Sequence, residues 1–242
     1  MQKLVLASLF AGSLAFPAAA VETAAQISTH MGEMGGQLTD STGGSVLETL
    51  QFEPWQMLEE MFLRDDVVFL MRHGPTDWSK LDEKGVQPTD CPNQRIMSDE
   101  GRAAMRNLGN IMATNDILPS QIVVSQWCRN QQTLEELMAG VADVDTGMAE
   151  IPIETDPDLN LLLSLNGAPN VVGLRKRVTE WDGNDGKGPL LLISHFTNIE
   201  ELTTFTVYEG EILVIDPKRE NRVIGYLRLR SASPDVGHFN VE

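Results

Sequence analysis

Three short, uninterrupted apolar runs dominate the hydrophobic pattern of the chain, at residues 67–71, 122–124 and 190–193. Runs of this length without polar interruptions are typical of strands that are buried on both faces of a sheet. Strands of this kind occur mainly in parallel sheets, where crossover helices cover both faces. The three runs therefore predict the central strands of a parallel sheet.

Segments with helical periodicity lie between and after these runs. One helix is predicted to begin near Ser98, a second to cover 134–141, and a third to cover 199–205. Strands that alternate with helices indicate the α/β class. We therefore predict a single three-layer α/β domain, with a mostly parallel sheet and helices on both of its faces.

The C-terminal part of the chain has a different pattern. Two apolar stretches, 211–215 and 223–229, flank the turn-like segment 216–221, which predicts an antiparallel hairpin at the edge of the sheet. No internal repeat is present, so residues 65–242 are assigned to one catalytic domain. With 42% hydrophobic residues, the chain can bury a core of this size.

Residues 21–64 are assigned to an N-terminal lead-in. From Val21 to Gly44 the sequence is polar and rich in Gly, Ser and Thr, which favours irregular structure. From Val46 to Leu63 the apolar residues recur at roughly helical intervals, so one helix is predicted there.

The first twenty residues have the layout of a secretory signal. Lys3 precedes the apolar run Leu4–Phe16, and the small residues Ala18–Ala20 follow it. The alternative is a membrane anchor, but this run is shorter than the roughly 20 residues that a span needs. We therefore expect a signal peptide at 1–20, a periplasmic or secreted protein, and no membrane span in the mature chain.

The charge of the chain narrows the range of partners. The formal net charge is −17, and only 18 residues are Lys or Arg. A chain this acidic repels nucleic acid, so no nucleic-acid partner is expected. An anionic substrate requires a local cationic pocket that acts against the overall field. The pattern does not indicate an oligomeric state.

The two cysteines, Cys91 and Cys128, are interpreted through the expected export of the protein. In an exported protein, an even number of cysteines is read as a disulfide, here Cys91 with Cys128. The alternative is two separate thiols, and neither cysteine lies in an evident nucleophile motif.

Basic and imidazole side chains follow each of the three buried runs. Arg72 and His73 follow the first, Arg129 follows the second, and His195 follows the third. In open α/β sheets, ligands bind at the carboxyl ends of the strands. Guanidinium groups bind phosphate oxygens in pairs, and histidine serves as a nucleophile or a donor. These residues therefore predict a phosphate site.

Other phosphate-binding and metal-binding patterns are missing from the sequence. No His, Cys or acidic spacing indicates a metal site, and no Gly-rich nucleotide loop is present. We therefore expect phosphate chemistry without a metal or another cofactor.

Four segments of the chain, taken together and in order, resemble the histidine phosphatase superfamily, the phosphoglycerate-mutase-like proteins. They are the Arg-His-Gly segment 72–78, the helix-opening segment 95–102, the Ser-x-x-x-Arg-x-x-x-Thr stretch 125–133 and the second-histidine segment 194–199. The resemblance covers roughly residues 65–232. It implies a phosphatase that forms a phosphohistidine intermediate.

Residue by residue, the resemblance implies that His73 is the nucleophile. It implies that Arg72, Arg129 and His195 hold the phosphate oxygens. It further implies contacts with the substrate from the hydroxyl of Thr76 and the backbone N–H of Phe196.

The chain departs from the family at the proton donor for the leaving group. One branch has an Asp directly after the second histidine, where this chain has Phe196. The other branch has a Glu in a segment comparable to 158–163, where this chain has none. Substitute candidates are Asp90, Glu154, Asp158 and Glu200.

We therefore expect a metal-independent phosphatase that hydrolyses a phosphorylated small molecule or an envelope sugar. The alternative is a non-catalytic phosphate-ligand binding protein on the same fold. Turnover that depends on His73 separates the two hypotheses, because a binding protein needs no nucleophile.

Overall fold

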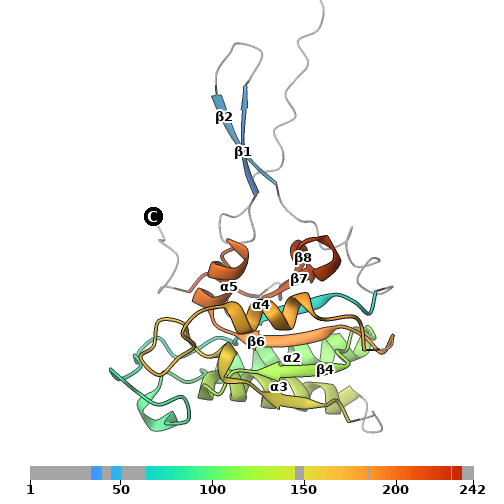
Figure 1. The fold of residues 1–242 in the computed structure, drawn as a ribbon. Helices are drawn as coiled ribbons and strands as arrows, with labels where there is room; N and C mark the ends of the chain where they lie inside the picture. Colours follow the sequence, from blue (N-terminus) through green and yellow to red (C-terminus); the bar gives the residue numbers. More distant parts are fainter. Residues whose placement is uncertain are drawn as a thin grey trace, which may run out of the picture.

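The computed structural model describes residues 64–144, 150–184, 186–229 and 231–235, together with the backbone of 34–39 and 45–50 (Figure 1). A six-stranded sheet forms the centre, in the order β5-β4-β6-β3-β7-β8. The strands are β3 (Val68–Arg72), β4 (Gln121–Val124), β5 (Ile153–Thr155), β6 (Leu190–Ser194), β7 (Ile212–Asp216) and β8 (Arg222–Leu227).

Neighbouring strands from β5 to β3 pair in parallel, whereas β7 pairs antiparallel with both β3 and β8. The predicted parallel sheet and its C-terminal hairpin are therefore confirmed. Four helices flank the sheet, joined by three short 3-10 turns. These elements are α2 (Asp99–Thr114), α3 (Cys128–Val144), α4 (Val172–Thr179), α5 (Phe196–Thr203), η1 (Cys91–Asn93), η2 (Pro157–Leu159) and η3 (Pro217–Arg219).

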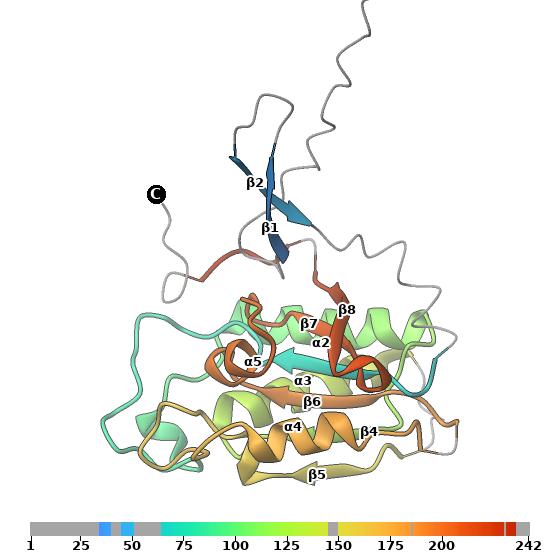
Figure 2. The same cartoon turned by 45° about the horizontal axis from the view of Figure 1, so that its top comes forward.

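The helices lie in two layers, with α2 and α3 on one face of the sheet and α4 and α5 on the other (Figures 1 and 2). Alternation along β3 explains this arrangement. Phe69 and Met71 pack in the cluster that includes the apolar residues of α2 and α3. Val68 and Leu70 pack in the cluster that includes those of α4 and α5. The three-layer prediction is confirmed.

The start of α2 is fixed by its cap and by a glycine. The hydroxyl of Ser98 accepts a hydrogen bond from the backbone N–H of Gly101, as an N-cap does. A Cβ at Gly101 would lie 2.0 Å from the carbonyl oxygen of Pro75, so only glycine allows this approach. The helix start is therefore packed against the loop that follows β3.

Two elements were not predicted from the sequence. Strand β5 has only three residues at the sheet edge, and its residues are largely accessible to solvent. Helix α4 carries only two buried apolar residues, Leu174 and Val178. Neither segment has a strong hydrophobic period, which is the main signal for an element in a sequence.

The prediction for the lead-in was wrong where the structure describes it. Strands β1 (Met34–Thr39) and β2 (Ser45–Leu50) form an antiparallel pair, where irregular structure and the start of a helix were expected. The apolar residues Val46, Leu47 and Leu50 fit either period, and pairing with β1 satisfies the backbone of this segment. Residues 1–20 and 51–63 lie outside the described residues.

Cys91 and Cys128 form a disulfide with an S–S distance of 2.00 Å and a Cα–Cα distance of 5.5 Å. The bond connects η1 to the first residue of α3, next to Arg129. Among the residues that the structure describes, no helix has the length and apolar character needed to cross a membrane.

Candidate active site

The carboxyl ends of β3, β4 and β6 bring three distant segments together. The backbone N–H of His73 donates to the carbonyl oxygen of Ser194, at 3.1 Å. The backbone N–H of Ser125, at the end of β4, donates to the carbonyl of Ile193, at 3.0 Å. As a result, the rings of His73 and His195 lie with their centroids 5.5 Å apart.

Both predicted arginines are buried beside these histidines. The guanidinium carbon of Arg72 lies 5.2 Å from the ring centroid of Phe196. That of Arg129 lies 4.8 Å from Trp127, whose ring also contacts His195. The structure therefore groups Arg72, His73, Arg129 and His195, and their catalytic roles stay predictions.

His73 is held in a form suited to nucleophilic attack. Its Nδ1 lies 3.0 Å from the carbonyl oxygen of Gly74, which can only accept, so Nδ1 carries the proton. The lone pair is then on Nε2. Burial, followed by the charges of Arg129 and Arg72, lowers the pKa of His73 well below its ordinary value. The imidazole is therefore neutral at neutral pH.

His195 is connected to a second polar pair. Its Nε2 lies 3.0 Å from the hydroxyl of Ser125, which is also 2.9 Å from Oδ1 of Asn160. When Ser125 donates to His195, the ring proton is on Nδ1. This Nδ1 is buried and has no partner among the described residues. Burial and then Arg129 lower the pKa of His195 well below its ordinary value.

Carboxylates that the sequence did not reveal hold Arg72 in place. Its Nη1 and Nη2 donate to the two carboxylate oxygens of Asp235, at 2.9 and 3.0 Å. Nη1 also donates to the carbonyl of Val207, at 2.9 Å, and Nη2 lies 3.4 Å from Glu209. Both terminal nitrogens of the guanidinium are thus held by the protein.

Arg129 is held in a similar way by the loop between β3 and α2. Its Nη1 lies 3.0 and 3.1 Å from the carboxylate oxygens of Asp82. The same nitrogen donates to the carbonyl oxygen of Arg95, at 3.3 Å. Because these bonds fix one end of the guanidinium, its remaining N–H groups are preorganised.

Several buried nitrogen atoms of this group have no partner among the described residues. They are Nε of Arg72, Nε of Arg95, Nε of Arg129 and Nδ1 of His195. Buried polar groups are normally hydrogen-bonded, so unpaired ones require an explanation. Nitrogen donors grouped in this way suit the oxygens of a phosphoryl anion.

The two predicted secondary contacts have different surroundings. The hydroxyl of Thr76 donates to Glu209 at 2.6 Å, so it is already engaged within the protein. Phe196 is the first residue of α5, and His195 is the residue before it. Substrate contacts by Thr76 and by the backbone N–H of Phe196 stay predictions.

None of the four substitute acids has a described contact with His73 or His195. Glu154 pairs with Arg177, Asp90 accepts from Asn93, and Asp158 and Glu200 are exposed. Glu209 is closer to the site. However, its carboxylate accepts from the hydroxyl and N–H of Thr76 and from the indole of Trp78. With these donors, Glu209 acts as an anchor.

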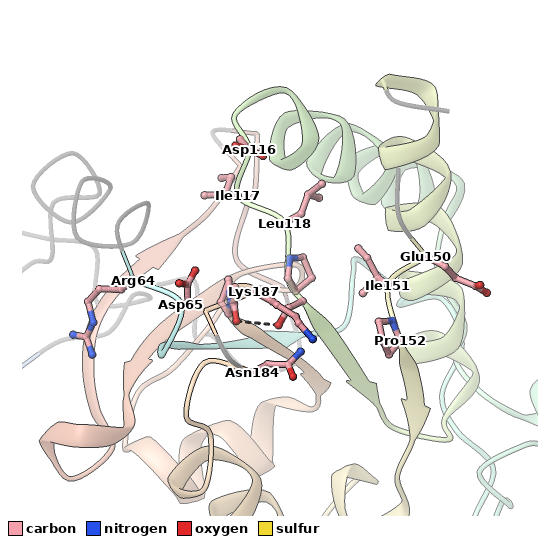
Figure 3. A pocket seen from close by; sticks show the side chains of 14 residues that line it. Arg64, Asp65, Asp116, Ile117, Leu118, Glu150, Ile151, Pro152, Asn184 and Lys187 are labelled. Carbon is pink, nitrogen blue, oxygen red and sulfur yellow. Dashed lines mark hydrogen bonds between the residues drawn. The ribbon is translucent and has the colours of Figure 1, made fainter. Parts of the chain in front are cut away.

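Two cavities lie outside this group of residues. One of about 630 Å³ borders the site's outer wall, where Trp78, Glu209 and Asp235 line it. Another, of about 670 Å³, opens between Arg64, Ile117 and Lys187, among others (Figure 3). It includes none of the predicted site residues. Among the residues that are described, no cluster of three His, Cys, Asp or Glu could hold a metal ion.

Glu211, at the start of β7, is a buried acid that leads to a prediction about stability. Its Oε2 accepts from the backbone N–H of Tyr208 at 2.7 Å, and burial raises its pKa to about 8. The stability that the protonated form provides is complete below pH 4.5 and is lost as the pH rises to about 8. The expected slope is up to about 1.4 kcal/mol per pH unit.

Glu211→Gln is expected to remove this slope, because the amide oxygen still accepts from Tyr208 and carries no charge. Urea unfolding at several pH values between 4.5 and 8 measures the effect. Glu201→Gln, at an exposed position, is the matched control and should keep the slope of the wild type. Parallel pH profiles for the wild type and Glu211→Gln would contradict the prediction.

Comparison with known proteins supports the same reading of the site. Residues 68–160 match the family model of the histidine phosphatase superfamily (branch 1). No curated protein sequence matches the chain at a significant level. Several solved structures are similar in fold.

Three examples illustrate this similarity. The protein histidine phosphatase SixA complexed with tungstate is 20% identical, over 66% of this chain and 92% of its own, with a TM-score of 0.46. The alpha-ribazole phosphatase from Shigella flexneri is 16% identical, over 70% and 99%, with a TM-score of 0.48. The ecdysone phosphate phosphatase from Bombix mori is 11% identical, over 73% and 96%, with a TM-score of 0.44.

The family assignment therefore depends on the sequence match, which includes the Arg-His-Gly segment and Arg129. It supports an enzyme of phosphatase or mutase type that acts on a small phosphorylated substrate. The chain belongs to the histidine phosphatase superfamily.

Proposed function

We propose that this protein is a metal-independent phosphatase that hydrolyses a phosphorylated small molecule through a phosphohistidine on His73. The observation that carries the proposal is the state of His73. Its Nδ1 proton is donated to Gly74, so a neutral imidazole presents Nε2 beside two buried arginines.

The reaction then has two steps. In the first, the Nε2 lone pair of His73 attacks phosphorus, and the bond to the leaving oxygen breaks with its electron pair. Arg72 and Arg129 neutralise the charge on the non-bridging oxygens, as preorganised donors do. In the second, water attacks the phosphohistidine, inorganic phosphate leaves, and the lone pair returns to Nε2.

The first step lacks an evident proton donor for the leaving group. The four substitute acids have no described contact with the histidines, and Glu209 is engaged as an acceptor. General acid catalysis typically contributes about 10²–10⁴-fold. We therefore propose that the natural substrate has a good leaving group, such as a phosphoramidate or an anhydride, or a sugar that donates its own proton.

A series of aryl phosphates with different leaving-group pKa tests this part of the proposal. The rate of phosphohistidine formation is expected to fall steeply as the leaving-group pKa rises, because nothing protonates the departing oxygen. Single-turnover measurements isolate this step. A flat dependence would show that a proton donor exists. Activity that persists with EDTA is expected throughout.

The same proposal includes export to the periplasm or the medium, where phosphorylated envelope sugars are candidate substrates. The segment Lys3–Ala20 supports it, because it has the layout of a signal peptide. Sequencing the N-terminus of the protein recovered from the periplasmic fraction tests it. A mature N-terminus near Val21 is expected, and an intact Met1 in the cytoplasmic fraction would contradict export.

The alternative, a phosphate-ligand binding protein, predicts tight binding without turnover. A binding site requires the arginines but no nucleophile in a defined tautomer. Turnover of 4-nitrophenyl phosphate, together with a phosphate bound to the chain after rapid acid-free denaturation, supports the enzyme. Binding without either result supports the alternative.

A further inference from the structure

A third arginine, Arg95, lies buried beside the predicted phosphate site and was not among the predicted site residues. Its side chain is 8% exposed, and its guanidinium carbon lies 3.5 Å from the ring centroid of Trp78. Its Nε is buried and has no hydrogen-bond partner among the described residues. Burying a cation costs free energy unless an anion compensates for it.

The nearby carboxylates do not form ion pairs with the Arg95 side chain in the described part of the chain. Asp82 accepts from the backbone N–H of Arg95, at 2.7 Å, and pairs with Arg129. Glu209 accepts from Thr76 and from the indole N–H of Trp78. The guanidinium therefore has an aromatic face beneath it and is left without a bound anion.

The position of Arg95 is fixed relative to Arg129. The carbonyl oxygen of Arg95 accepts from Nη1 of Arg129, and both residues bond to the same carboxylate, Asp82. Glu209 in turn fixes Trp78, on which Arg95 stacks. A cation held in this way is preorganised to receive an anion, which lowers the entropy cost of binding.

The charge of Arg95 persists at neutral pH and extends to the reacting groups. Burial, and then the neighbouring Arg129, lowers the pKa of Arg95 to about 10, which leaves the group protonated. Arg95 is also one of the three arginines whose charges lower the pKa of His195. It is therefore near the phosphoryl site.

We propose that Arg95 and Trp78 form a second anion subsite, so the preferred substrate carries another phosphate or carboxylate close to the phosphoryl group that His73 removes. The inference builds on the proposed function, since it places the transferred phosphoryl group between Arg72 and Arg129. Diphosphates and compounds with an anion on a neighbouring carbon share the required chemistry.

Binding tests the subsite without any need for turnover. Calorimetry compares inorganic pyrophosphate with orthophosphate in the wild type, Arg95→Gln and Arg95→Lys. The wild type is expected to prefer pyrophosphate, and Arg95→Gln should reduce this preference by about tenfold or more, as expected for a hydrogen bond to a charged group. Arg95→Lys, which keeps the charge but loses the planar fork, should fall between the two.

Turnover then distinguishes the two sources of the second anion. The value of kcat/KM is compared for phenyl phosphate with phenyl diphosphate, and for glycerol 3-phosphate with 3-phosphoglycerate. The variant with a reduced ratio in the first pair indicates a diphosphate, and in the second pair a carboxylate. Arg106→Gln removes a surface arginine from α2 that pairs with Asp143, and it is the control for loss of one charge.

A smaller change in the binding preference than in the prediction, or equal losses for both anions, would overturn the subsite. Failure of the proposed function has a different signature. In that case both anions bind with the expected preference, but no ester is hydrolysed and no phosphohistidine forms.

Discussion

His73→Ala is expected to reduce the turnover of 4-nitrophenyl phosphate by at least about 10⁴-fold, because loss of a nucleophile removes the covalent route altogether. The neutral imidazole with its proton donated to Gly74 is the group that forms the new bond. Steady-state rates measure the loss. Acid-labile, base-stable phosphate on the chain, the property of a phosphohistidine, should disappear in parallel.

His73→Asn is the companion variant, since it keeps an N–H donor for the Gly74 carbonyl but has no imidazole. Similar thermal unfolding of both variants and the wild type would show that the fold is retained. A phosphate label that persists on the chain in either variant would place the nucleophile elsewhere. Turnover within about tenfold of the wild type would have the same meaning.

The second large effect is expected at Arg129. Arg129→Lys should lower kcat by about 10²–10³-fold, the typical cost of one preorganised donor to the transition state. A lysine keeps the positive charge near Asp82, but it is a point charge and cannot present the planar edge that binds two phosphate oxygens. The prediction is therefore a loss in kcat that exceeds the change in KM.

Arg102→Lys is the matched control, because Arg102 pairs with Glu136 on the partly exposed side of α2. Its kcat should remain close to that of the wild type. If Arg129→Lys changes kcat by less than about tenfold, Arg129 does not contact the transferred phosphoryl group.

Charge balance explains why the cationic site can exist in an acidic protein. Three buried arginines meet three carboxylates, which are Asp82, Glu209 and Asp235. Desolvated cations without such partners would destabilise the fold. The carboxylates hold the terminal nitrogens of Arg72 and Arg129, whereas Nε of each remains unpaired. The same contacts stabilise the site and leave donors for a ligand.

The sequence by itself determined the main elements of the catalytic domain and the residues at the strand ends. Continuous apolar runs identified β3, β4 and β6, because strands covered on both faces have no polar positions. The carboxyl-end rule then grouped His73 with His195. Weakly periodic segments such as β5 and α4 were missed, and the strand β2 was mistaken for part of a helix.

Only the tertiary structure decided which groups hold the site residues. The contact between Arg72 and Asp235 joins positions 163 residues apart, and that between Thr76 and Glu209 joins positions 133 apart. The tautomer of His73 depends on a carbonyl oxygen, and the place of Arg95 depends on the ring of Trp78. Such contacts leave no period in the sequence, because they depend on where loops meet after folding.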